Sequence, residues 1–101
     1  MSTKTIKFLE KLTGGPLTFA KMLQGIRKSD EVSQVELAKA IKTSKGLICD
    51  IEKGRRLPTL EQAREMAKFL GYSVEGFISI LIQDQLRNAK ISMKVTLEKA
   101  S

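Results

Sequence analysis

The chain has 101 residues with a formal net charge of +7, one cysteine and no histidine. This length suits a single domain, and the charge favours a polyanionic partner, either nucleic acid or an acidic membrane surface. The missing histidine excludes histidine-dependent catalysis and a cysteine–histidine metal site, and the lone cysteine excludes an internal disulfide.

Two further features bear on where the chain acts. No apolar run reaches the roughly 18 residues of a membrane span. Lys4, Lys7, Glu10 and Lys11 interrupt the apolar core that a secretory signal would need at the N-terminus. We therefore expect a cytoplasmic protein. We expect it to need no cofactor and no metal.

Residues 1–16 are predicted to be an N-terminal extension ahead of the main domain. Their apolar residues are spaced as in a short helix, which we favour. Residues 3–8 also alternate polar and apolar side chains, so a strand is the alternative. Gly14-Gly15-Pro16 would end either element.

The first helix of the main domain is predicted from Leu17 to Lys28, with Thr18 as its N-cap. Apolar residues recur along it at i, i+3, i+4 and i+7, as expected for one buried face. These residues are Phe19, Met22, Leu23 and Ile26.

Two short helices joined by a tight turn are predicted next. Ser33 and Glu36 form a capping-box pattern at the start of the first, which runs over about residues 34–41. The turn is Lys42-Thr43-Ser44, where Ser44 can cap the second helix.

The second short helix is predicted over residues 45–53, with Leu47, Ile48 and Ile51 facing inward. Gly54 ends it, as a glycine does just past the last turn of a helix. Two helices joined by about three residues are typical of the helix-turn-helix motif, whose second helix enters the major groove of DNA.

Two longer helices follow. The first begins with the capping-box pair Thr59 and Gln62 and ends at Gly71. The second spans about residues 74–89, and its apolar side chains cover more than one face. We expect part of that surface to meet a second copy of the chain, whereas the alternative is that the N-terminal extension covers it. The residues concerned are Phe77, Ile78, Leu81 and Ile82.

A tail, residues 91–101, completes the chain. Apolar residues alternate with polar ones along it, which predicts a half-buried β-strand. The apolar positions are Ile91, Met93, Val95 and Leu97. Since one strand is not stable alone, we expect it to pair with a second subunit, the N-terminal extension or another protein. A disordered tail is the alternative.

The segment from Ser33 to Thr59 resembles the phage-repressor and Cro-type (XRE-like) helix-turn-helix family. The matching residues are Ser33-Gln34, Leu37-Ala38, Ile48, Ile51-Glu52, Gly54-Arg55-Arg56 and Pro58. With the flanking helices, the resemblance covers about residues 17–77. It implies an all-α fold: a five-helix, repressor-like domain over residues 17–90, to which we add the short N-terminal extension and the C-terminal strand.

One turn residue departs from the family pattern. The family usually has glycine where this chain has Lys42. A lysine there must either adopt a left-handed conformation, at a cost of roughly 1–2 kcal/mol, or tilt the turn.

The resemblance also implies an ion pair between Arg27 and Glu52. A glutamate among core positions needs a partner, so we favour this structural pair over an exposed, solvated Arg27.

Contacts with DNA phosphates are expected at both ends of the helix-turn-helix, where hydroxyl, amide and cationic groups can donate to phosphate oxygens. The candidate residues are Ser33, Gln34, Ser44, Lys53, Arg55 and Arg56.

Base contacts are expected from the outward face of the second short helix and from its first turn. The resemblance implies Lys45, Gly46 and Asp50 as the reading positions, with Leu47 and Cys49 nearby. Lys45 can donate to guanine O6 and N7, and Asp50 can accept from cytosine N4. Alternatively, Asp50 restrains Lys45 or Lys53 and touches no base. Gly46 would allow the backbone to approach a thymine methyl, and Cys49 is favoured as a small structural thiol over a redox switch. The candidate set is Lys45, Gly46, Leu47, Cys49 and Asp50.

These features predict a sequence-specific repressor that binds double-stranded DNA as a homodimer on an inverted repeat and regulates its own promoter. The resemblance also admits a HigA-like antitoxin that would bind a protein toxin through its tail. A third possibility is a protein-interaction module that has lost DNA reading. Nothing in the sequence favours an enzyme.

Overall fold

The structure is a computed structural model that describes residues 17–91, 95 and 97, and these residues form α-helices with no strand among them. The helices are α2 (Phe19–Ser29), α3 (Gln34–Ala40), α4 (Lys45–Glu52), α5 (Leu60–Leu70) and α6 (Val74–Asn88). The predicted all-α class is confirmed.

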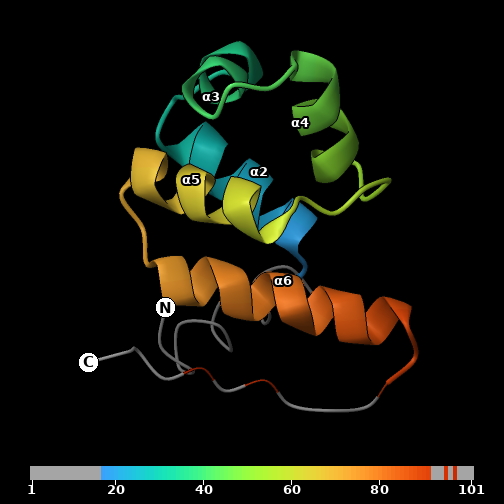
Figure 1. Cartoon of the computed structure of the whole chain (residues 1–101). Coiled ribbons are helices and arrows are strands. Elements are labelled where there is room, and N and C mark those ends of the chain that lie inside the picture. The colour runs from blue at the N-terminus through green and yellow to red at the C-terminus, as the bar shows by residue number, and fades with distance from the viewer. Residues whose placement is uncertain (1–16, 92–94, 96, 98–101) are drawn as a thin grey trace.

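The helices lie in three levels (Figure 1). α3 and α4 occupy one side of the domain, α6 occupies the other, and α2 and α5 lie between them. α2 packs against both α4 and α6, and α5 packs against both α3 and α6. The helix-turn-helix therefore rests on a base formed by the other three helices.

Each helix begins at a serine or threonine whose side-chain oxygen accepts a backbone N–H of the first turn. The N-caps are Thr18, Ser33, Ser44, Thr59 and Ser73. Such a cap typically contributes about 1 kcal/mol. Both predicted capping boxes are present, at α3 and α5. These local signals explain why the predicted helix starts agree closely with the observed ones.

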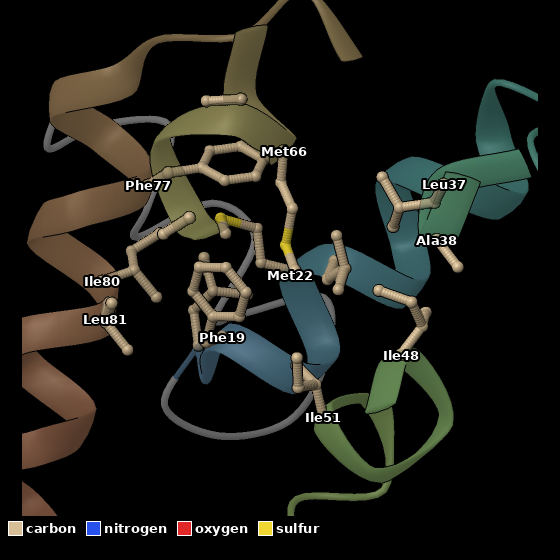
Figure 2. Packing of buried hydrophobic residues seen from close by; sticks show 14 residues of the cluster. Phe19, Met22, Leu37, Ala38, Ile48, Ile51, Met66, Phe77, Ile80 and Leu81 are labelled. Carbon is tan, nitrogen blue, oxygen red and sulfur yellow. The ribbon is translucent and has the colours of Figure 1, made fainter. Parts of the chain in front are cut away.

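The core is a single cluster to which all five helices contribute. Figure 2 shows Phe19 and Met22 of α2 pointing toward Phe77 of α6, with Ile48 and Ile51 of α4 on another side of α2. The rings of Phe19 and Phe77 meet edge to face with centroids 5.7 Å apart, a favourable aromatic geometry. The core thus joins the helix-turn-helix to α6 through α2.

The turn between α3 and α4 contains a strained lysine. Lys42 has a φ of 59°, in the left-handed region, which is the first of the two alternatives that the sequence left open. The next backbone N–H, of Thr43, donates to the Ala38 carbonyl at 2.8 Å, which closes the end of α3. Gly54 and Gly71 adopt the same conformation, with φ of 75° and 79°, and end α4 and α5 as predicted.

The expected docking surface on α6 is partly wrong. Phe77 and Leu81 are fully buried in the chain's own core, so they cannot meet a second subunit without unfolding. They lie one helical turn apart on the stripe that faces α2 and α5. Ile78 and Ile82, one position further along, are only half-buried. These two remain candidates for a docking surface.

The tail and the extension are mostly outside the described residues. Residues 1–16 and Met93 lie there, so their predicted structures are untested. Ile91 and Leu97 are exposed, and neither they nor Val95 lie in a strand. The Val95 backbone N–H donates to the Gln83 side chain at 3.2 Å, which brings this point of the tail against α6.

The left-handed lysine gives a stability prediction. Replacing Lys42 by glycine removes the Cβ clash of this conformation, although glycine is more flexible in the unfolded chain. We expect Lys42→Gly to raise the free energy of unfolding by about 0.5–1 kcal/mol, measured by guanidinium denaturation. Lys42→Ala is the control, because it removes the same charge but keeps the Cβ. Equal stability of the two variants would contradict the strain argument.

Candidate nucleic-acid interface

A buried ion pair fixes α4 to α2. Arg27 Nε lies 2.7 Å from Glu52 Oε2, and Arg27 Nη2 donates to Glu52 Oε1 at 2.9 Å. The third nitrogen, Nη1, donates to the Val32 carbonyl at 3.0 Å. One guanidinium therefore joins α2, the loop ahead of α3 and the end of α4. This is the pair that the family resemblance implies.

The ion pair is well shielded from water. The Glu52 side chain is only 2% exposed, so its charge depends on the partners around it. The hydrogen bond with Glu52 raises the pKa of Arg27 above its ordinary value, and the nearby negative charge adds to this against the opposing effect of burial. Arg27 therefore stays charged throughout the accessible pH range.

Gln34 takes part in the same network. Its side-chain Nε2 donates to Glu52 Oε1 at 3.2 Å. Gln34 is the first residue of α3, so this contact links α3 to the end of α4. The amide nitrogen carries a second hydrogen that Glu52 does not use, and this hydrogen remains available to a phosphate oxygen.

The two serines proposed to contact phosphates are exposed and act as N-caps. The hydroxyl of Ser33 accepts the Glu36 N–H at 3.0 Å, and that of Ser44 accepts the Leu47 N–H at 3.1 Å. In both cases the oxygen is the acceptor, so the hydroxyl proton is still available for donation to an anion.

The basic candidates lie just past the end of α4. Lys53 is the C-cap of that helix, and Arg55 and Arg56 follow Gly54. All three side chains are exposed. They form a short cationic segment beside the outward face of α4, as the sequence predicts.

The candidate base-reading residues divide into two groups. Lys45 and Gly46 are exposed at the start of α4. Leu47 packs partly against the core, and Cys49 and Asp50 are half-buried. Lys45 and Gly46 are therefore the most accessible part of the expected reading surface.

Asp50 has a partner that the sequence did not suggest. Arg55 Nη1 lies 3.6 Å from Asp50 Oδ1, and the Arg55 backbone N–H donates to the Asp50 carbonyl at 2.9 Å. The left-handed Gly54 returns the chain toward α4. The structure thus pairs Asp50 with Arg55, whereas the sequence suggested Lys45 or Lys53.

The positive charge is unevenly distributed. Residues 17–59 contain nine basic and five acidic residues, a net charge of +4, whereas residues 60–91 contain four of each and are neutral. Within the described residues, the excess positive charge therefore belongs to the half of the domain that carries the helix-turn-helix. This favours an anion on that side.

The described part of the chain shows neither a metal-ligand cluster nor a membrane-spanning helix. Residues 17–91, 95 and 97 contain no group of three potential metal ligands. None of the described helices combines the length and the apolar character that crossing a membrane requires.

One buried charged residue was missed from the sequence. Asp84 of α6 is 5% exposed and accepts the backbone N–H of Phe19 at 2.8 Å. Its position was a usable signal, because Asp84 follows Phe77, Ile80 and Leu81 at the spacing of one buried helical stripe.

The arrangement described above defines a DNA-binding helix-turn-helix domain. Comparison with protein families agrees: the family described as helix-turn-helix matches residues 23–77, more than half of the chain. The chain belongs to this family, of the XRE type, and is a DNA-binding regulator. No curated protein matches the sequence significantly.

Three solved structures are similar to this chain. The clp gene regulator ClgR from Corynebacterium glutamicum is 25% identical, with a TM-score of 0.57 over 71% of this chain and 77% of its own. A mutant of the restriction-modification controller protein C.Esp1396I is also 25% identical, with a TM-score of 0.55 over 68% and 90%. A hypothetical protein from E. coli is 18% identical, with a TM-score of 0.65 over 74% and 78%, and shows the fold alone.

The buried ion pair gives a second stability prediction. Arg27→Met leaves the Glu52 carboxylate buried without its counter-charge, so we expect a loss of about 3 kcal/mol in the free energy of unfolding. Arg55→Met is the matched control, because Arg55 forms an exposed pair with Asp50. We expect that control to cost less than about 1 kcal/mol.

Urea denaturation of both variants checks this prediction. A double variant, Arg27→Met with Glu52→Met, should be less destabilised than the sum of its single variants, because it leaves no unpaired buried charge. Additive losses would show that the two side chains do not depend on each other.

Proposed function

We propose that this regulator is a sequence-specific transcriptional repressor that binds an inverted-repeat operator as a homodimer. The observation that carries the proposal is the two-sided arrangement of α4. Its inner face, with Ile48 and Ile51, is packed into the core, while Lys45 and Gly46 are exposed beside the basic segment after Gly54. A helix anchored in this way can enter the major groove without moving relative to the core.

Two kinds of contact follow from this arrangement. Ser33, Gln34 and Ser44, together with the basic segment, would donate to phosphates and set the register of the domain. Lys45 would donate to guanine O6 and N7 at the start of α4. Asp50 would read a base only after Arg55 leaves it for a phosphate, since the two are paired in the free chain.

The length of α4 supports a dimer. The helix has 8 residues, about 12 Å, which is the span of about four base pairs at roughly 3.4 Å each. So short a site cannot specify one promoter in a genome. Domains of this kind reach adequate specificity by binding two half-sites about one helical turn apart.

An exposed apolar groove supplies a candidate dimer surface. It lies between α5 and α6, and its lining residues are Leu60, Val74 and Ile78 together with the charged Glu61 and Arg64. Leu60 is 52% exposed. A two-fold related copy would bring the same apolar surface and the same pair of opposite charges to the contact. Ile78 is one of the α6 residues that the sequence assigned to docking.

The antitoxin subtype lacks comparable support, because its docking strand falls mainly on residues outside the described part of the chain. We therefore propose the repressor alone. A protein-interaction module that no longer recognises a DNA sequence is one outcome of the test below.

Selection of bound duplexes from a random DNA pool tests sequence reading. We expect an inverted repeat to be enriched, with log affinity falling steeply with log salt concentration because several phosphates are neutralised. Lys45→Ala should relax the preference at one base position by roughly tenfold. Lys90 is an exposed lysine just past the end of α6, and Lys90→Ala should leave the base preference unchanged.

A winning duplex also tests autoregulation, because the proposed repressor should have such a site at its own promoter. If no duplex is enriched and binding equals that of random DNA, the repressor proposal fails and the interaction module replaces it.

The dimer surface is tested by placing a charge in the groove. We expect Leu60→Glu to be monomeric by light scattering and to bind the inverted repeat at least tenfold more weakly, while its affinity for a single half-site stays unchanged. Phe69→Glu is the matched control, since Phe69 is 48% exposed on the same helix but does not line the groove. A dimeric Leu60→Glu would show that the dimer uses another surface.

A further inference from the structure

Asp84 has a place in the fold that the proposed DNA contacts do not explain. Among the described residues, only Asp84 and Glu52 are buried charged side chains. Asp84 Oδ2 accepts the Phe19 backbone N–H at 2.8 Å, and Asp84 Oδ1 accepts from Arg87 Nη1 at 2.7 Å. The first contact joins residues that are 65 positions apart in the sequence.

The contact satisfies the first turn of α2. Phe19 is the first residue of this helix, and its N–H has no partner within the helix itself. The N-cap residue Thr18 accepts a different N–H, that of Lys21. The Asp84 carboxylate also lies where the dipole of α2 favours a negative charge. Asp84 therefore holds the N-terminal end of α2 against α6.

The other end of α2 carries Arg27, which binds Glu52 of α4. The helix is thus held at each end by a buried carboxylate that comes from a different helix. Figure 1 shows α2 between α6 on one side and α4 on the other. Since a packed helix moves as a rigid element, a displacement at Phe19 changes the position of Arg27 as well.

We propose that Asp84 is a positioning residue for α4: by holding the start of α2, it keeps Arg27 where its guanidinium can bind Glu52 and the Val32 carbonyl together. Glu52 in turn binds Gln34, the first residue of α3. Asp84 touches no part of the proposed DNA surface, so it acts only through α2. The consequence for DNA affinity rests on the proposed function, whereas the link from Asp84 to Arg27 does not.

The first measurement uses the free full-length chain. Hydrogen exchange at Arg27 Nε, followed by NMR, reports how well Glu52 protects that N–H. Each variant is measured at a temperature at which circular dichroism shows it to be folded. We expect at least about threefold faster exchange in Asp84→Ala, because the start of α2 is no longer held.

Two control variants separate the parts of the contact. Asp84→Asn changes the net charge as Asp84→Ala does but keeps an oxygen that can accept the Phe19 N–H, so it should exchange at the wild-type rate. Arg87→Gln removes the ion pair and leaves the Phe19 contact, so it should also match the wild type.

The second measurement uses the duplex that the wild-type chain selects. Asp84→Ala should bind this duplex at least about threefold more weakly than Asp84→Asn, with equal affinity for random DNA and an equal salt dependence. If the Asp84 side chain only stabilised the fold, its removal would lower the melting temperature and leave the specific affinity of the folded protein unchanged.

The outcomes are distinguishable. If folded Asp84→Ala matches Asp84→Asn in Arg27 exchange and in specific affinity, Asp84 is only a helix cap and the proposal is overturned. If Asp84→Ala does not fold, Asp84→Glu replaces it, since its longer side chain misplaces the carboxylate; the same differences are expected. If the wild-type chain selects no duplex, the repressor proposal fails, and Arg27 exchange still decides whether Asp84 controls the ion pair.

Discussion

The orientation of α4 depends on one buried guanidinium–carboxylate pair. Glu52 is almost inaccessible to water, so its charge would be strongly unfavourable without Arg27. The hydrogen bonds of Arg27 reach α4 and the loop ahead of α3 from a single side chain. Apolar packing alone tolerates rotation and sliding of a helix, whereas a bidentate pair has a narrow range of distances and angles. The ion pair therefore fixes the orientation of α4, which the apolar contacts of the core determine less strictly.

The need for such a constraint follows from helix length. α3 has 7 residues and α4 has 8, and isolated helices shorter than about 12 residues are marginal in water. Their N-caps stabilise them in part, and the burial of Leu37, Ile48 and Ile51 in the core stabilises them further. All of these stabilising groups lie at helix starts or on inner faces. The outward face of α4 is not needed to pack the core, so a weak helix former such as Gly46 is tolerated there.

Local chemistry was predictable from the sequence, and long-range geometry was only partly so. Ser33, Thr59 and Gly71 mark helix ends through contacts within a few residues, so their patterns are readable along the chain. Asp84 bonds across 65 positions, and no local pattern identifies its partner. The apolar side chains of α6 cover more than one face, so the sequence alone does not show whether Phe77 and Leu81 face the core or a docking partner. Only the packing of α2 and α5 shows which face is inside.

Similarity of fold to other proteins does not identify the DNA sequence that this chain binds. ClgR and C.Esp1396I share the fold at 25% identity, so most positions can differ while the fold persists. Residues on the outer face of α4 are under none of these packing constraints, so their identities can change while the fold persists. Lys45 and the Asp50–Arg55 pair therefore have to be interpreted from their own chemistry.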